Sequence, residues 1–301
     1  MRLSNVAHLR LPFGRLLGYD VTAHGTGRAL PLSFDQRRHV GGGDRPGSWM
    51  AICFTLPVPV ARQRLSAAWL AVIARHGTLR SGFAPGPDGV PVLEELEVTP
   101  GQWVEHPVAS GQAVNDCVRD VLDATCTPFA TPSHRLLVLE TAQRPTVVIG
   151  ADHAHVDMWS MLVVIRDLLA ALDLTDGESI PELTLVPPFA DHTAALADRD
   201  PAPDDVRRRW AEVLAASGDV MPRFPLPLGE PVPHAERGEL RDVLDVDDAA
   251  ALAAQARGDG VSILTTVVAA MTAVTRDLAD SPLRAVFPVH SRYDARWHDS
   301  V

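Results

Sequence analysis

The sequence is poor in cysteine and has no segment typical of export or of a membrane span. Its 301 residues include three cysteines, Cys53, Cys117 and Cys126, whose spacing does not resemble that of a zinc site. Residues 1–19 contain no continuous apolar core of the signal-peptide type. The longest apolar run, residues 261–274, is interrupted by hydroxyl side chains and is too short to cross a bilayer. These absences predict a protein of the reducing cytoplasm without a membrane span.

The sequence also lacks an excess of basic charge. Its formal net charge is -11 at pH 7. Nucleic acids are bound by clustered Lys and Arg, so this balance argues against a nucleic-acid partner. Hydrophobic residues make up 46% of the chain and charged residues 22%, which is typical of a globular protein. The length is sufficient for one large domain or two ordinary ones.

The most informative stretch runs from Thr146 to Leu172. Residues 146–149 form a short, largely β-branched run typical of a buried strand, and residues 159–172 carry apolar side chains at helical spacing. Four ionisable residues lie between them within six positions: Asp152, His153, His155 and Asp157. This density at the end of a buried strand is costly unless the groups are paired or used in chemistry. We therefore expect the active site here.

Two families carry motifs that resemble this stretch. Condensation-domain proteins have the motif His-His-x-x-x-Asp-Gly at a strand-to-helix junction; here Asp152 replaces the first His, His153 and Asp157 match, and Met158 replaces the Gly. Metallo-β-lactamases have a His-x-His-x-Asp-His box, which would use His153, His155 and Asp157 as metal ligands. In that alignment Met158 stands in place of the last His, and a thioether is a poor ligand for zinc.

Other segments resemble the condensation-domain superfamily, which includes polyketide-associated acyltransferases and chloramphenicol acetyltransferase. A Ser-x-x-Gln pattern is matched by residues 33–36, and Arg-His-x-x-Leu-Arg-x-x-Phe is matched by residues 75–83. Pro128-Phe129 precedes an expected strand at residues 135–139, and residues 189–192 resemble a Tyr-x-Asp-Tyr-like box with both aromatic positions changed. None of these matches has a counterpart in metallo-β-lactamases.

The resemblance implies an α/β (α+β) fold of two chloramphenicol-acetyltransferase-like lobes in a V-shaped pseudo-dimer. Residues 1–175 would form the first lobe with the His-x-x-x-Asp motif. Residues 176–237, rich in Pro, Asp and Gly, would form a crossover with one helix. Residues 238–301 would begin the second lobe, with strand-like segments at residues 243–246 and 283–289.

The end of the sequence suggests that this second lobe is incomplete. In the family, a Gly-x-Phe-x-Asn run follows a segment that resembles residues 297–301, where this sequence stops. We expect the missing C-terminal half to be supplied in cis or in trans. Residues 1–301 alone should then show little activity, and should associate or bind a hydrophobic dye.

The resemblance also implies acyl transfer in natural-product or lipid biosynthesis, such as nonribosomal peptide synthesis. The donor would be a thioester on the phosphopantetheine arm of an acyl or peptidyl carrier protein, or on coenzyme A. The acceptor would be a small-molecule amine or hydroxyl, giving an amide or an ester. No permanently bound cofactor and no metal are implied.

The resemblance assigns roles to individual residues. His153 would accept the proton of the acceptor or position its nucleophile. Asp157 would pair with Arg292 and hold the loop that aims His153, although an Asp at this position also suits a helix N-cap. Backbone N–H groups at the start of the helix, at Met158, Trp159 and Ser160, would support the oxyanion.

Some alternatives stay open at this level. His153 could be a structural histidine at the end of the strand, and His155 could be a loop residue. Met158 could narrow the channel through which substrates reach the active site, or it could indicate a weakly active protein. Asp152 need not abolish function, because the first His of the motif is often substituted. A non-catalytic member that recruits a carrier protein or partner enzyme, and a zinc-dependent hydrolase, are the two rival functions.

Overall fold

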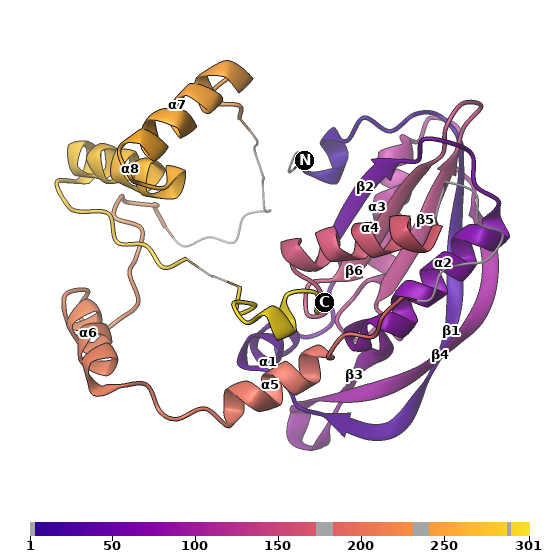
Figure 1. Cartoon of the computed structure of the whole chain (residues 1–301), viewed down its shortest axis with the longest axis horizontal. Coiled ribbons are helices and arrows are strands. Elements are labelled where there is room, and N and C mark those ends of the chain that lie inside the picture. The colour runs from indigo at the N-terminus through magenta and orange to yellow at the C-terminus, as the bar shows by residue number, and fades with distance from the viewer. Residues whose placement is uncertain (1–3, 173–182, 231–240, 288–289) are drawn as a thin grey trace. The chain divides into compact units, whose positions relative to one another are not determined.

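The computed structural model describes residues 4–172, 183–230, 241–287 and 290–301, which fall into two compact units (Figure 1). One unit consists of Val6–Arg199 and Ser291–Val301, and is called the sheet unit below. Asp200–His290 belongs to the other, the helical unit. The division predicted at residues 175 and 237 falls at segments outside the described residues and stays a prediction. Residues 291–301 belong to the sheet unit rather than to the residues that precede them.

A six-stranded antiparallel sheet forms the centre of the sheet unit, which confirms the predicted α/β class (Figure 1). The strand order is β2-β6-β5-β1-β4-β3. The strands are β1 (Arg15–Leu30), β2 (Trp49–Thr55), β3 (Ser81–Pro85), β4 (Pro91–His106), β5 (His134–Glu140) and β6 (Thr146–Asp152). Strand β6 is longer than the expected run at residues 146–149 and ends at Asp152, so the motif starts on the sheet itself.

Helices cover both faces of this sheet because side chains of successive strand residues point to opposite sides. Leu136 and Val138 of β5 pack with α2 (Arg62–Arg75) and α4 (Met158–Leu172) on one face. Leu137 and Leu139 pack with α3 (Val114–Thr125) on the other. Strand β6 shows the same alternation. It is buried along its whole length, which explains why its sequence is an almost continuous apolar run.

Gly150 on β6 is required by the close approach of α3. A Cβ atom at this position would lie 2.5 Å from Cδ2 of Leu122, whose side chain is completely buried, so this side chain would have to shift. The glycine therefore lets α3 pack directly against the strand that leads to the motif.

The described part of the helical unit contains α6 (Asp204–Ala215), α7 (Val246–Gly258) and α8 (Ile263–Ala279). The predicted crossover holds two helices rather than one, because α5 (Phe189–Ala197) precedes α6. The strands expected at residues 243–246 and 283–289 do not form within the described residues: α7 begins at Val246, and residues 283–287 are irregular. A strand needs a hydrogen-bonded neighbour, and the described part of this unit offers none.

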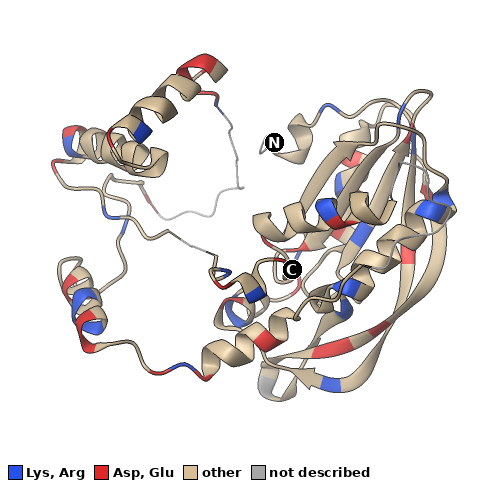
Figure 2. Ribbon diagram, in the orientation of Figure 1, with Lys and Arg blue, Asp and Glu red and all other residues tan. Residues whose placement is uncertain are grey.

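Helix α8 has an apolar surface that the described residues leave exposed. Figure 2 shows that most of α8 carries no charged side chain, and its charged residues, Arg276 and Asp277, lie in the last turns. Within the described residues, no helix is by itself long and apolar enough to span a membrane. The bent pair of α7 and α8 reaches the required length and composition only when taken together.

Candidate active site

The motif lies where β6 ends and before α4 begins. The backbone N–H of His153 donates to the carbonyl oxygen of Ser48, 2.9 Å away, which continues the pairing of β6 with β2 by one residue. The N–H of His155 then donates to the carbonyl of Asp152, 2.9 Å away, which closes a turn. His153 thus lies at the first position beyond the sheet and is exposed.

The imidazole of His153 is held by one nitrogen and leaves the other free. Nδ1 lies 2.7 Å from the carbonyl oxygen of Val156, which can only accept a hydrogen bond. Nδ1 therefore carries a hydrogen, and in the neutral ring Nε2 keeps its lone pair. This tautomer is the one that a general base needs if the substrate approaches from the Nε2 side.

Asp152, which replaces the first motif histidine, is completely buried. Its Oδ2 accepts a short hydrogen bond from Oγ of Ser48, and its Oδ1 accepts from the backbone N–H of Ala154 at 2.9 Å. A third group, Nε2 of His39, lies 3.3 Å from Oδ1. A buried carboxylate is tolerated only when it is paired in this way. Asp152 fixes the loop from inside and does not face solvent.

Asp157 combines the two roles considered for it in the sequence. Its Oδ1 accepts from the backbone N–H and the hydroxyl of Ser160, both at 2.7 Å, which caps α4. Its Oδ2 forms an ion pair with Nη1 of Arg292 at 2.6 Å. The contact predicted between Asp157 and Arg292 is therefore present. Arg292 also donates to the Ser160 hydroxyl at 2.9 Å, so the three side chains form a closed cluster.

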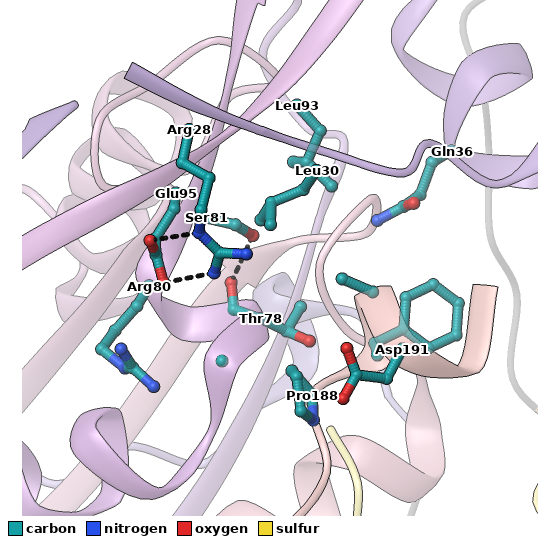
Figure 3. Close-up of a pocket in the computed structure, with 13 residues that line it drawn as sticks. Arg28, Leu30, Gln36, Thr78, Arg80, Ser81, Leu93, Glu95, Pro188 and Asp191 are labelled. Carbon is teal, nitrogen blue, oxygen red and sulfur yellow. Dashed lines mark hydrogen bonds and ion pairs between the residues drawn. The ribbon is translucent and has the colours of Figure 1, made fainter. Parts of the chain in front are cut away.

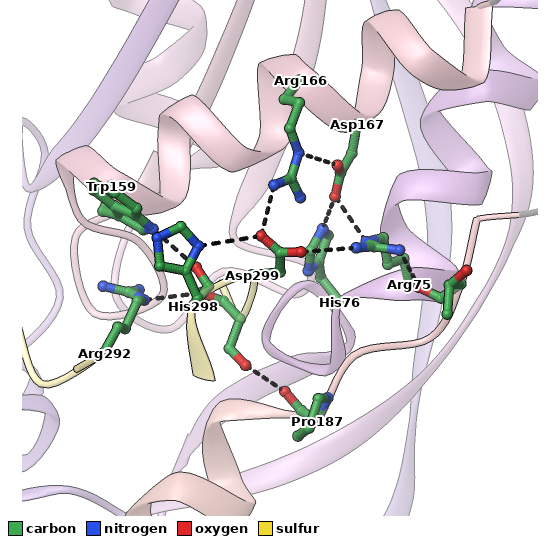
Figure 4. A network of polar contacts seen from close by, with 11 residues as sticks. Arg75, His76, Trp159, Arg166, Asp167, Pro187, Arg292, His298 and Asp299 are labelled. Atoms are coloured by element: carbon green, nitrogen blue, oxygen red, sulfur yellow. Dashed lines mark hydrogen bonds and ion pairs between the residues drawn. The ribbon is translucent and has the colours of Figure 1, made fainter. Parts of the chain in front are cut away.

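The start of α4 differs from the oxyanion site expected there. The N–H of Ser160 already donates to Asp157, so it is not free for a substrate oxygen. Trp159 donates from Nε1 to the carbonyl of His298 at 3.0 Å and thus holds the C-terminal segment (Figure 4). Met158 is 39% exposed at the first position of the helix. Trp159 and Ser160 act as anchors in this structure.

His155 does not share a site with His153. It is buried, its ring lies 5.0 Å from that of Phe83, and its Nδ1 lies 3.5 Å from Oγ of Ser81. Burial lowers the pKa of His155, and the nearby Asp152 acts in the opposite direction. The two histidines of a metallo-β-lactamase box would have to face one metal, whereas His153 is exposed at the loop and His155 packs into the core.

Gln36 links the Ser-x-x-Gln pattern to the active-site loop. Ser33 and Gln36 form a reciprocal capping box at the start of α1 (Phe34–Val40). The side-chain amide of Gln36 then donates to the carbonyl of Ala154, 3.1 Å away and buried. The sequence indicated the pattern but not this contact, because the spacing of a capping box says nothing about its distant partners.

The Arg75-His76 pair anchors α2 to α4 and to the C-terminal segment (Figure 4). Oδ2 of the buried Asp167 lies 2.8 Å from Nε2 of His76 and 2.8 Å from Nε of Arg75. Burial acts to raise the pKa of Asp167, but hydrogen bonds from His76 and Arg166 outweigh it, so this pKa lies below its ordinary value. Arg166 extends the cluster to Asp299, 2.6 Å away.

The same C-terminal segment is fixed at further points. The hydroxyl of Thr78 donates to the carbonyl of Val301 at 2.6 Å, and the hydroxyl of Ser300 donates to the carbonyl of Pro187 at 2.8 Å. His192, the last residue of the Tyr-x-Asp-Tyr-like box, is buried and its ring contacts those of Phe189 and Trp297. These contacts hold Arg292 close to Asp157.

A pocket of about 140 Å³ lies beside the active-site loop between β6 and α4 (Figure 3). Two of its lining residues, Gln36 and Ser81, are those that contact Ala154 and His155. One wall is the ion pair of Arg28 and Glu95, at 2.6 Å, in which the hydrogen bond from Arg28 lowers the pKa of Glu95. The remaining lining residues are Leu30, Gly77, Thr78, Arg80, Leu93, Pro188, Phe189, Ala190 and Asp191.

The family model of the condensation domain matches residues 41–292, most of the chain, and the chain belongs to this family. Nonribosomal peptide synthetase 32 of Fusarium pseudograminearum is 30% identical over 211 residues, which are 65% of this chain and 2% of that protein. The probable non-canonical nonribosomal peptide synthetase CymA of Salinispora arenicola is 28% identical over 288 residues, or 90% of this chain and 4% of that protein. The chain thus spans a small part of the length of these relatives.

Solved structures show the same fold. The PapA2 acyl transferase superposes with a TM-score of 0.74 at 20% identity, over 92% of this chain and 64% of that one. The first condensation domain of the calcium-dependent antibiotic synthetase gives a TM-score of 0.63 at 19% identity, over 92% of this chain and 67% of that one. The predicted family and the predicted α/β class are confirmed.

Proposed function

We propose that this chain takes part in condensation-type acyl transfer, in which an acyl or peptidyl group passes from a thioester to an amine or hydroxyl acceptor. The observation that carries the proposal is the geometry of His153. Its Nδ1 is engaged by Val156 at 2.7 Å, which leaves Nε2 as the free acceptor of an exposed ring. Membership of the condensation family supports the same chemistry.

The reaction would proceed through His153. Nε2 accepts a proton from the acceptor's amine or hydroxyl as its nitrogen or oxygen attacks the thioester carbonyl. The carbon–sulfur bond then breaks, and the proton passes to the departing thiolate. A positioned base of this kind accelerates a reaction by roughly 10²–10⁴-fold. Asp157 touches no reacting atom in this scheme; it holds the start of α4, and Arg292 holds Asp157.

The donor we propose is a thioester on the phosphopantetheine arm of a carrier protein, with coenzyme A as the alternative. Support comes from the two relatives described above, both of which are named as nonribosomal peptide synthetases. The arm is part of the substrate, so no resident cofactor is needed.

The test is acyl transfer by the His153→Ala variant, measured by intact mass of an acyl-loaded carrier protein with amine and hydroxyl acceptors. We expect transfer to fall by at least about 10²-fold. The melting temperature should hardly change, because the ring makes one backbone hydrogen bond at the surface. His24→Ala, an exposed histidine of β1, is the matched control.

Each of the other outcomes would favour a different role for His153 or a different function for the chain. Transfer at the wild-type rate would refute the role of His153, and loss of folding would assign it a structural role. If the wild-type chain binds a carrier protein but transfers nothing, the non-catalytic function is favoured. Zinc in the purified protein together with hydrolysis of the thioester would favour the hydrolase.

A further inference from the structure

His39, on helix α1, packs against the proposed catalytic histidine. The centroids of the His39 and His153 rings lie 5.9 Å apart, and the planes meet at 67°, an edge-to-face arrangement. Nε2 of His39 also lies 3.3 Å from Oδ1 of Asp152. His39 is therefore in contact with both residues that stand at the His-His positions of the motif.

The hydrogen positions on His39 follow from its neighbours. Nη2 of Arg45 lies 3.3 Å from each ring nitrogen of His39, and a guanidinium can only donate. A carboxylate can only accept, so the hydrogen of the neutral ring belongs on Nε2, facing Asp152. Nδ1 is then the acceptor for Arg45. Arg45 is itself fixed by the carbonyls of His39 and Gly43, each at 3.0 Å.

We propose that His39 is a positioning residue of the active site, where its ring and Asp152 together take the place of the missing first motif histidine and fix the ring of His153. This inference rests on the proposed function. In this chain the motif supplies a carboxylate, Asp152, where an imidazole is expected, and α1 brings an imidazole to that carboxylate. The edge-to-face contact with His39 restricts rotation of the His153 ring, in addition to the hydrogen bond between Nδ1 of His153 and the carbonyl of Val156.

The charges around His39 predict how acid affects the site. Burial lowers the pKa of His39, and Arg45 and His153 act in the same direction, whereas Asp152 acts to raise it. Above this pKa, His39 is a neutral donor to Asp152. In acid, a second proton on His39 places a positive charge beside His153. Protonation of His39 should therefore add to the fall of the rate in acid, and the acid limb of the rate profile should be steeper than in a variant without this ring.

The first experiment compares His39→Gln with His39→Leu. Gln keeps an N–H donor for Asp152 but does not titrate, whereas Leu keeps bulk and loses the donor. For His39→Leu we expect kcat to fall by about 10–100-fold, the loss typical when a group that orients a metal-binding side chain is removed from a metal site. KM should change less than about twofold. His39→Gln should restore most of kcat, and the slope of log kcat/KM in acid should become shallower than in the wild type.

His24→Leu on β1 is the control and should match the wild type in kcat, KM and slope. Wild-type kcat in His39→Leu, or an unchanged acid slope in His39→Gln, would overturn the proposal. Should His39→Leu fail to fold, the slope of His39→Gln decides alone.

The second experiment does not depend on acyl transfer. Histidine Cε1–H resonances followed by NMR against pH give the pKa of His39 directly. Asp152→Asn should lower it, because the carboxylate is lost, and Arg45→Gln should raise it, because the cation is lost. Opposite shifts confirm the contacts even if the wild-type chain transfers no acyl group, in which case the proposed function alone fails. A pKa of His39 that is the same in the wild type and in Arg45→Gln would overturn the inference.

Discussion

Asp157 binds a helix terminus with one carboxylate oxygen and an arginine with the other. Burial acts to raise the pKa of Asp157, but hydrogen bonds from Arg292 and Ser160 outweigh it, so this pKa lies below its ordinary value. The folded state therefore favours the ionised form. This contribution to stability is present above about pH 4 and is lost as the pH falls through the lowered pKa of the folded state.

We predict that Asp157→Ala and Arg292→Ala each lower the free energy of unfolding by about 1–3 kcal/mol, because both break the same cluster. Asp157 is 40% exposed, so solvent reduces the loss below that of a fully buried pair. The double variant should lose less than the sum of the single ones. Urea unfolding of the four proteins measures this, and simple additivity would contradict the cluster.

The four residues from Asp152, the last residue of β6, to His155 show how much depends on local contacts. The side chain of Asp152 is buried, whereas that of His153 is exposed. The backbone N–H of Ala154 donates to Asp152, and the ring of His155 packs against that of Phe83. Neighbouring titratable residues therefore have separate environments. Their density in the sequence indicates a site, but it does not tell which of them faces a substrate.

At the scale of the element, helix α8 presents one apolar stripe. Leu264, Val267, Met271, Val274 and Leu278 recur at spacings of three and four residues and are all exposed in the described structure. Such a stripe is normally covered by another apolar surface. Ser262 caps the start of the helix by accepting from the N–H of Thr265 at 3.1 Å, so the helix itself is well defined.

We predict that the 301-residue chain binds a hydrophobic dye or self-associates through this stripe. Val267→Glu and Met271→Glu should reduce dye fluorescence and shift the chain towards monomer in sedimentation. Leu228→Glu, an exposed residue of the same unit outside any helix, is the control and should change neither measurement. A monodisperse wild-type chain without dye binding would contradict this prediction.

At the scale of the whole molecule, buried histidines set the response to acid. His134 on β5 is buried with Nε2 3.0 Å from the carbonyl of Leu79, and burial lowers its pKa to about 3. Burial also lowers the pKa values of His76 and His155. Each favours the folded state above the unfolded pKa near 6.5 and loses this contribution as the pH falls towards its folded value.

We therefore predict that the sheet unit loses stability between about pH 6.5 and 4, before its carboxylates are protonated. A histidine that stays neutral in this range contributes a loss of about 1.4 kcal/mol per pH unit. His134→Gln keeps a donor for Leu79 without a titrating ring, so its stability should depend less on pH. Urea unfolding at several pH values measures the slope, and equal slopes in the two proteins would contradict the prediction.

The sequence by itself determined the family, the α/β class and the place of the motif. These follow from local patterns: the apolar run of β6, the helical spacing of α4 and the residues between them. The strands expected at residues 243–246 and 283–289 failed within the described part because apolar, branched sequence becomes a strand only beside a hydrogen-bonding neighbour.

Only the tertiary structure decided which groups serve the site. In the folded chain the N–H of Ser160 is engaged by Asp157, and His155 is buried in the core. Helix α1, far away in the sequence, brings His39 to Asp152 and His153. These outcomes depend on how α1, the loop and residues 291–301 pack together. Contacts between segments far apart in a chain leave no periodicity in its sequence, so only the folded structure could show them.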